Sequence, residues 1–165
     1  MFDKYLISQK RKEWKSFSPN ECIFCKIASH DKDISRKEIW SNDKIMILLN
    51  IFPYTVGHLQ VVPISHITTY RELLKTRLIF SINEIIEDCM ILLSKTYNPD
   101  GYNIGLNLGR AAGNSIEHIH FHIVPRYYNQ DIHGFMEVCA DTKIVGENID
   151  EALERLKHNS QGLFI

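Results

Sequence analysis

The stretch His118-Ile-His-Phe-His-Ile-Val124 decides how the rest of this 165-residue chain is interpreted. Side chains on a β-strand alternate between its two faces, so a strand here would hold His118, His120 and His122 in one row. Neighbouring histidines in such a row lie roughly 6.5 to 7 Å apart, close enough to serve one ligand or two adjoining sites. The apolar residues between them would point into a core. The stretch therefore predicts a strand with chemistry on one face and core packing on the other.

The composition is that of an ordinary globular chain. Hydrophobic residues make up 44% and charged residues 24% of the sequence, and a chain of this length can bury one core without disulfides. The formal charge of −1 argues against nucleic acid or an anionic membrane as a partner, because proteins that bind these carry an excess of Lys and Arg. No apolar run approaches the roughly 20 residues of a membrane span, and the N-terminus lacks a signal-peptide core. We therefore expect a cytoplasmic protein.

The segments around the histidine stretch indicate an α+β fold. Apolar runs separated by turn residues predict strands near 39–40, 44–51, 58–64 and 102–108. Thr69 to Glu72 fits a capping box, and the apolar residues from Leu78 onward keep a helical period until Asn98-Pro-Asp-Gly101 ends the helix. A shorter helix is expected from about Asp150 to His158. We expect an antiparallel meander sheet with a long helix and a shorter helix packed on it.

Cys22-Ile-Phe-Cys25 has the spacing of a metal-binding or redox-active pair. A redox motif is expected after a strand, and no strand pattern precedes Cys22, so a zinc knuckle is preferred. Structural zinc takes four Cys or His ligands, and the best candidates for the other two are His66, after a strand, and His118. Three further histidines are expected to be solvated and two further cysteines to be buried, namely His30, His133, His158, Cys89 and Cys139.

If His118 binds metal, His120 and His122 remain for a reaction. A neutral imidazole is a good nucleophile at pH 7 and a good leaving group once protonated, so it can carry a phosphoryl group through a covalent intermediate. Donors for phosphate oxygens are available nearby, from Gly113, Asn114, Ser115 and His58. Together these residues favour phosphorus chemistry.

The chain resembles the histidine triad (HIT) family, whose signature is three histidines alternating with hydrophobic residues. The resemblance runs from roughly Cys22 to Leu156. Besides the triad it rests on Asn50, Gly57-His58, Pro63 before His66, Asn107, the Gly113-Asn114-Ser115 loop and Val124-Pro125-Arg126. It implies a HIT-like fold and a homodimer, and the apolar residues Ile79, Ile86 and Met90 of the long helix also favour a dimer because they exceed what one core is expected to cover. The mixture of apolar and basic residues before Pro19 predicts an N-terminal arm or helix over 1–20, followed by a HIT domain over 21–165 with a C-terminal extension from about 127.

The resemblance also implies roles for individual residues. HIT proteins are nucleotide hydrolases and transferases, so His120 would attack the α-phosphate of an adenine nucleotide. Asn50 would contact the ribose, and the phosphates or leaving group would be held by His58, His122, Asn107, Gly113, Asn114 and Ser115. Many members carry Gln where this chain has Asn114. The four residues Cys22, Cys25, His66 and His118 are similar to the structural zinc site of the zinc-bearing branch.

The substrate is expected to resemble diadenosine tetraphosphate. The segment Gly105 to Gly113, with Phe135-Met136 and Asp141 to Lys143, is similar to a branch that includes diadenosine tetraphosphate phosphorylases and hydrolases. Either phosphate or water would resolve the nucleotidyl-histidine. Three alternatives stay open: an adenosine phosphoramidate hydrolase, a zinc enzyme whose metal is held by all three triad histidines, and a non-catalytic nucleotide-binding module.

Overall fold

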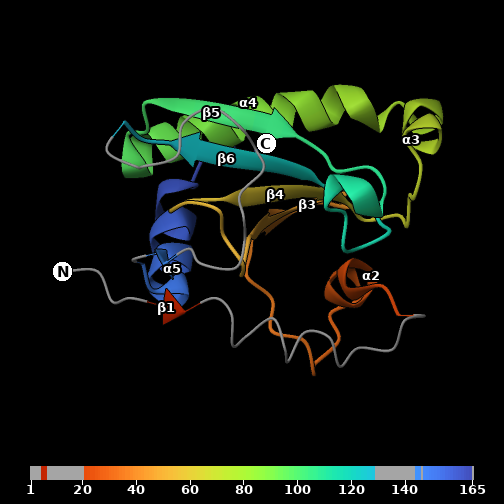
Figure 1. Ribbon diagram of the computed structural model, residues 1–165, viewed down its shortest axis with the longest axis horizontal. Coiled ribbons are helices and arrows are strands. Elements are labelled where there is room, and N and C mark those ends of the chain that lie inside the picture. Colours follow the sequence, from red (N-terminus) through yellow and green to blue (C-terminus); the bar gives the residue numbers. More distant parts are fainter. Residues whose placement is uncertain (1–4, 7–20, 129–143, 146, 165) are drawn as a thin grey trace.

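A five-stranded antiparallel sheet forms the centre of the protein, with its strands in the order β2-β3-β4-β6-β5. The structure, a computed structural model, describes residues 5–6, 21–128, 144–145 and 147–164 (Figure 1). The strands of the sheet are β2 (Glu38–Ser41), β3 (Ile45–Leu49), β4 (Leu59–Pro63), β5 (Gly101–Gly105) and β6 (Phe121–Arg126). Two short strands, β1 (Tyr5–Leu6) and β7 (Ile144–Val145), form a separate antiparallel pair. The expected α+β class with an antiparallel sheet is confirmed.

The last two strands of the sheet do not simply extend the meander. β2, β3 and β4 pair in sequence order, as expected. The chain then crosses over through the helices, and β5 lies at the edge while β6 returns between β4 and β5. The histidine-bearing strand therefore has neighbours on both sides.

In the described residues, the helical segments that accompany the sheet are α2 (Ile23–Ala28), α3 (Tyr70–Thr76), α4 (Leu78–Tyr97), the 3-10 turn η1 (Arg110–Ala112) and α5 (Ile149–Asn159). The predicted capping box is present, because Thr69 Oγ1 accepts from Glu72 N and the Glu72 carboxylate accepts from Thr69 N. Asn98 ends α4 in the left-handed conformation, which fits the predicted breaker. The sequence patterns did not predict helix α2, whose N-cap residue Cys22 makes no side-chain capping hydrogen bond.

The sheet is covered on both faces (Figure 1). On one face α4 and α5 pack on alternate residues of β3, β4 and β6 to form the main core. On the other face α2 packs on the intervening residues Met46, Leu48 and Val62. Every residue of β3 is consequently buried, which accounts for its continuous apolar sequence. In the part of the chain that the structure describes, no helix is long and apolar enough to cross a membrane.

The histidine strand begins later than its alternating pattern predicts. β6 starts at Phe121, where Val61 is its last partner on β4. Before that point the chain leaves β4, and Ile119 N donates instead to Ile67 O at 2.7 Å. The expected division between faces is nevertheless present, because Ile119, Phe121 and Ile123 all belong to the main core.

Several sequence-based expectations fall on residues outside the described ranges. These include most of the N-terminal arm, His133, Cys139, and the segments 135–136 and 141–143. Of the remaining residues expected to lack a role, His30 and His158 are exposed and Cys89 is buried, as predicted.

Candidate active site and metal centre

Four side chains from three separate segments converge beside α2. The ligand atoms of Cys22, Cys25, His66 and His118 all lie within 4.8 Å of one another. His118 Nδ1 is 3.3 Å from Cys22 Sγ and 3.6 Å from Cys25 Sγ. His66 Nδ1 is 3.3 Å from both Cys25 Sγ and His118 Nδ1. A tetrahedral zinc ion with ordinary bond lengths separates its Cys and His ligand atoms by about 3.3 to 3.8 Å. The cluster therefore has the residues and the spacing to hold a metal ion.

The tautomer of His118 also suits a metal ligand. Its Nε2–H donates to Pro63 O at 2.9 Å, which leaves Nδ1 without a proton and directed at the cysteines. Burial lowers the pKa of this ring to about 4, so it is neutral at pH 7. Burial raises the pKa of the Cys25 thiol to about 11, with a further contribution from the neighbouring Cys22. A bound divalent cation would reverse that effect and favour the thiolate.

The imidazole of His120 is oriented by the backbone carbonyl of His118. Its Nδ1–H donates to His118 O at 2.8 Å, so the neutral ring carries its free lone pair on Nε2. The ring is 5% exposed, and burial lowers its pKa below the ordinary range. Phe24, on α2, packs on it with ring centroids 4.9 Å apart. His120 is therefore a neutral imidazole with one unprotonated nitrogen free of the backbone.

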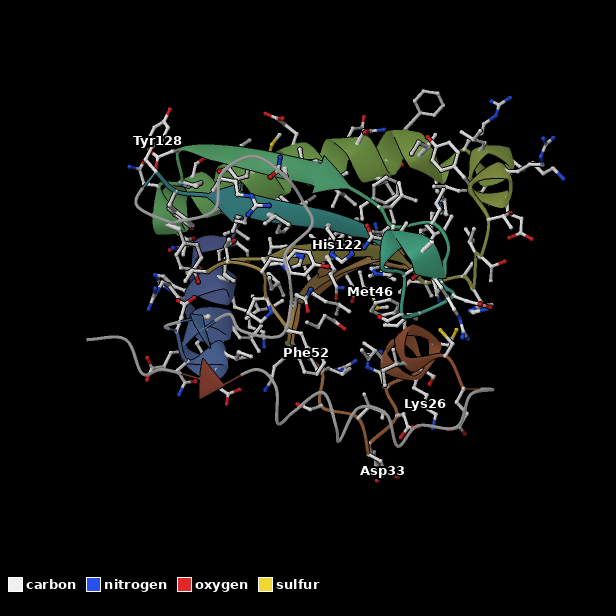
Figure 2. The ribbon with its side chains drawn as sticks, in the orientation of Figure 1. Lys26, Asp33, Met46, Phe52, His122 and Tyr128 are labelled. Carbon is white, nitrogen blue, oxygen red and sulfur yellow. The ribbon has the colours of Figure 1, made fainter. Side chains whose placement is uncertain are left out.

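His58 and His122 form a hydrogen-bonded pair between the start of β4 and the middle of β6. His58 Nδ1 accepts from Tyr54 N at 3.0 Å, so the proton of the neutral ring is on Nε2. That Nε2–H donates to His122 Nδ1 at 2.9 Å. His122 in turn has its proton on Nε2, where it can be donated to a ligand. Figure 2 shows His122 on the face of the sheet that α2 covers.

Burial keeps both rings of this pair neutral. It lowers the pKa of His122 to about 3, and it lowers the pKa of the fully buried His58 well below the ordinary range. The positive charges that protonation would add to neighbouring histidines lower both pKa values further. The pair therefore works as an uncharged relay of hydrogen bonds.

His58 lies one step further from a ligand than the sequence suggests. Both of its ring nitrogens have partners within the protein. Nε2 donates to His122, and Nδ1 accepts from Tyr54 N and also contacts Asn50 Nδ2 at 3.2 Å. Asn50 Oδ1 accepts from Phe52 N at 2.9 Å, so this buried side chain braces the turn before β4. The imidazole of His58 is thus bonded to His122 and to the turn before β4. The sequence shows His58 next to a turn but contains no sign of this bond.

The loop before β6 supplies fewer backbone donors than its glycines suggest. Gly113 N donates to Arg110 O and Asn114 N donates to Gly109 O, so both amides are used within the turn. Asn114 Oδ1 accepts from Ile116 N at 3.2 Å, which leaves its Nδ2 as the donor. Ser115 is exposed. Asn107 joins this loop, since its Nδ2 lies 3.5 Å from the position a Cβ would take on Gly113.

The three triad histidines do not share one ligand. Nδ1 of His118 faces the cysteines, Nδ1 of His120 is bonded to a carbonyl, and Nδ1 of His122 accepts from His58. Within the described residues, the metal cluster includes only the first of them. This geometry speaks against a catalytic metal held by all three histidines.

Comparison with known proteins gives a consistent result. The family model described as HIT domain matches residues 31–129. An uncharacterised HIT-like protein of Methanocaldococcus jannaschii is 35% identical over 136 residues, which are 82% of this chain and 98% of the relative. An AP-4-A phosphorylase of Mycobacterium tuberculosis is 30% identical over 102 residues, which are 61% of this chain and 51% of that protein.

Solved structures with the same fold support this result. A HIT family protein of Bacillus anthracis aligns with a TM-score of 0.63 and 27% identity, over 74% of this chain and 85% of its own. A zinc-bound histidine triad family protein of Mycobacterium smegmatis aligns with a TM-score of 0.69 and 23% identity, over 85% of this chain and 93% of its own. At that identity the second likeness concerns the fold alone.

Proposed function

The chain belongs to the HIT domain family, and from this premise we propose that it cleaves adenine dinucleoside polyphosphates at the α-phosphate through a nucleotidyl-histidine. The substrate class would be that of diadenosine tetraphosphate. The name of one relative, AP-4-A phosphorylase, supports this choice. The observation that carries the proposal is the tautomer of His120. Its Nδ1–H is committed to His118 O, so the nucleophilic nitrogen is fixed as Nε2.

The chemistry has two steps. In the first, His120 Nε2 bonds to the α-phosphorus, and the bond from phosphorus to the bridging oxygen breaks, with its electron pair leaving on the polyphosphate. In the second, water or phosphate attacks the same phosphorus, and the phosphorus–nitrogen bond breaks to restore the imidazole. His122 Nε2–H would donate to a non-bridging oxygen in both steps, where negative charge develops.

The remaining site residues would bind the nucleotide. Asn114 Nδ2 and the Ser115 hydroxyl are suited to donate hydrogen bonds to phosphate or to the leaving oxygen, with Asn107 and Gly113 shaping the same loop. The ribose would lie near Asn50. His58 would fix the tautomer of His122 rather than touch phosphate itself.

The Cys22, Cys25, His66, His118 cluster would hold one structural zinc ion. Four Cys and His ligands close the coordination shell, so such an ion supplies stability and no open position for substrate. It would tie α2, and with it Phe24, to the segment that leads into β6. We therefore infer zinc as the cofactor, with a supporting role outside the chemical step.

We also propose a homodimer. Three apolar residues of the long helix give this proposal little support, because Ile86 is buried and Ile79 and Met90 pack on the chain's own core. The open edge of the sheet at β5 gives better support, because Ile104 is 44% exposed there and Leu108 beyond it is 48% exposed. Light scattering at micromolar concentration should show twice the chain mass, and Ile104→Lys should shift the protein toward monomer. A monomeric wild type would end this proposal.

The covalent intermediate provides the direct test of function. Diadenosine tetraphosphate radiolabelled at the α-phosphate should leave acid-labile label on the protein after a quench in mild base. His120→Ala should lose both label and turnover while keeping nucleotide affinity. His120→Gly should regain part of the turnover when free imidazole is added. Turnover by His120→Ala at the wild-type rate would exclude this mechanism.

A substrate panel then separates the alternatives. Diadenosine polyphosphates and adenosine phosphoramidates should be compared with and without inorganic phosphate. ADP formation that requires phosphate indicates a phosphorylase, and AMP formation in water indicates a hydrolase. Faster cleavage of the phosphoramidates would favour the alternative substrate, and binding without any turnover would favour a non-catalytic module.

A further inference from the structure

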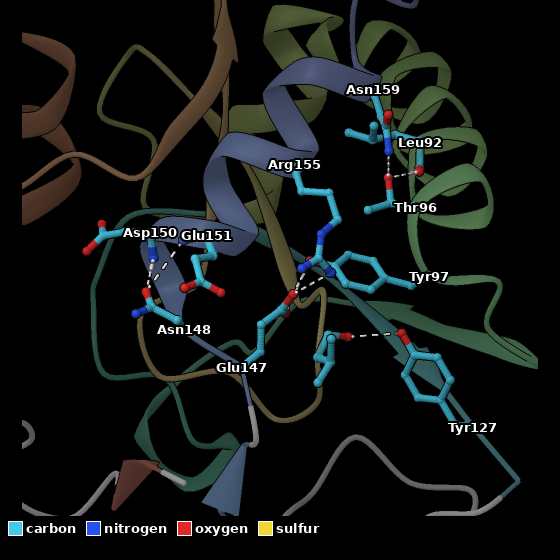
Figure 3. A network of polar contacts seen from close by, with 11 residues as sticks. Leu92, Thr96, Tyr97, Tyr127, Glu147, Asn148, Asp150, Glu151, Arg155 and Asn159 are labelled. Carbon is cyan, nitrogen blue, oxygen red and sulfur yellow. Dashed lines mark hydrogen bonds and ion pairs between the residues drawn. The ribbon is translucent and has the colours of Figure 1, made fainter. Parts of the chain in front are cut away.

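Glu147 is a buried carboxylate that lies outside the residues matched by the family model. It precedes α5 and is 7% exposed. Its oxygens accept from Tyr97 OH, at 3.0 Å for Oε1 and 3.1 Å for Oε2, and Oε1 accepts from Arg155 Nη1 at 3.0 Å. Figure 3 shows this group between α4 and α5. A buried carboxylate is costly unless it is fully paired, so its presence calls for an explanation.

Tyr97, the last residue of α4, connects this carboxylate to the turn before β4. Gly57 lies against its ring, because a Cβ added to Gly57 would be 3.0 Å from Tyr97 Cδ2 and 3.1 Å from Cε2. The hydroxyl of the same ring is bonded to Glu147. The carboxylate thus fixes the position of the surface on which Gly57 rests.

The turn over residues 55–58, here called the His58 loop, has two further attachments. Tyr127 OH donates to Val56 O at 3.2 Å, and Thr55 Oγ1 donates to Pro125 O at 2.8 Å. The groups that bind the loop are Pro125 O, near the end of β6, and Tyr127 OH, just after it. The loop is therefore held on one side by β6 and on the other by the Tyr97 ring.

Within the described residues, the cation that balances the charge of Glu147 is Arg155. Arg155 makes the ion pair and also lies over the Tyr97 ring, 5.7 Å from its centroid. Burial raises the pKa of Glu147, while the Tyr97 hydrogen bond and the Arg155 charge oppose that rise. Glu151 is the other acidic group that acts on it. The carboxylate, the ring and the guanidinium form one unit, here called the Glu147 cluster.

We infer that the Glu147 cluster is a positioning device for the His58 loop, and so for the catalytic hydrogen-bond relay, in an inference that rests on the proposed function. By holding the Tyr97 ring under Gly57, it fixes the backbone that precedes His58. This keeps His58 Nε2 at 2.9 Å from His122 Nδ1, and with it the tautomer that leaves His122 Nε2–H available for phosphate. Glu147 is a positioning residue, since it acts through Tyr97 and Gly57.

The test compares Glu147→Ala with a matched control at the same helix pair. Asn159→Ala removes a different bond between α5 and α4, from Asn159 Nδ2 to Thr96 Oγ1 at 3.0 Å (Figure 3). Both variants should lower the melting temperature. Only Glu147→Ala should lower kcat, by about tenfold with little change in KM, because misplacing a catalytic group affects the transition state most. Glu147→Gln keeps an acceptor for Tyr97 OH and should restore part of the loss.

Imidazole nitrogen NMR gives a readout that is independent of turnover. In the wild type His58 and His122 should both show the tautomer protonated on Nε2. Glu147→Ala should mix their tautomers, whereas Asn159→Ala should leave the signals unchanged. If Glu147→Ala does not fold, Tyr97→Phe removes the same hydrogen bond from the other side and should give the same shift.

The outcomes separate this inference from the proposed function. Unchanged imidazole signals and unchanged kcat in a destabilised but folded Glu147→Ala or Tyr97→Phe protein would overturn the positioning role. A wild type that turns over none of the nucleotides would refute the proposed function, and the tautomer measurement would still decide the positioning role.

Discussion

Replacing Gly57 with Ala probes the contact that joins the turn before β4 to the end of α4. Gly57 has φ +79, and an added Cβ would lie 3.0 Å from both Leu93 Cδ2 and Tyr97 Cδ2. The left-handed backbone costs a residue with a Cβ about 1–2 kcal/mol. Forcing a methyl group into packed side chains costs about 1–3 kcal/mol more. We therefore expect Gly57→Ala to reduce the free energy of unfolding by about 2–5 kcal/mol.

Gly162→Ala provides the matched control. Gly162 has the same φ of +79, but nothing lies within 4 Å of its added Cβ, so only the backbone cost of about 1–2 kcal/mol applies. Urea unfolding gives both free energies directly. In thermal unfolding, a chain of this size loses about 2–4 °C for each kcal/mol, so Gly57→Ala should melt about 4–20 °C below the wild type.

The difference between the two variants isolates the packing of Leu93 and Tyr97. If both lose the same free energy, the ring of Tyr97 does not restrain Gly57 and the reasoning is wrong. A Gly57→Ala protein that keeps wild-type stability would refute the backbone cost as well. Because Gly57 precedes His58, the surviving folded fraction of Gly57→Ala should also show reduced turnover.

Three further predictions concern the metal cluster, the buried histidine pair and the α3 cap. Purified protein should contain one zinc ion per chain, and the double variant Cys22→Ala, Cys25→Ala should contain none. At zinc concentrations 1,000 times Kd, the loss of the ion should reduce the free energy of unfolding by about 4 kcal/mol. Metal that remains bound to the double variant would refute the site. Burial lowers the pKa of His122 from 6.5 to about 3, so the unfolded chain binds a proton that the folded ring does not, and stability should fall as pH drops through this range by up to about 1.4 kcal/mol per unit. Urea titrations of His122→Gln should show that slope reduced by one proton, and an identical slope would contradict the shift. Thr69→Ala removes the acceptor for Glu72 N, at 3.2 Å, and should cost about 1 kcal/mol in urea unfolding; no loss would mean that the cap is not formed in solution.

Local sequence patterns were sufficient to predict much of the fold. The capping box at Thr69, the period of α4 and the left-handed end at Asn98 are all short-range features, and the structure contains each of them. The alternation in the histidine stretch also separates core from chemistry, as its period requires. These elements depend on neighbours only a few residues away, which is why the sequence reveals them.

The features that the sequence did not reveal depend on distant partners. α2 has Ile23, Phe24 and Ile27 at helical spacing, but Cys22 gives no capping signal and the helix is short. The late start of β6 follows from the bond between Ile119 N and Ile67 O, which links two loops. No motif joins Tyr97 to a carboxylate fifty positions away.

The partners of the buried histidines were equally hidden. The sequence identifies His58 and His122 as functional candidates, but it cannot show that one ring donates to the other. It also cannot show that the backbone amides of Gly113 and Asn114 are hydrogen-bonded within their own turn. Candidate residues can thus be found from a motif, whereas the protonation state of each ring requires the folded geometry.

The position of β6 inside the sheet has a consequence for how the protein is made. β4 leaves the ribosome with its hydrogen-bonding edge unpaired, and its partner β6 follows only after roughly 60 residues, or about 3 to 12 seconds of translation. During that interval the nascent chain exposes an apolar strand edge that can pair with another chain. Slower synthesis between β4 and β6 should therefore increase aggregation, and chaperones that bind extended apolar segments should act on this protein before its histidine strand emerges.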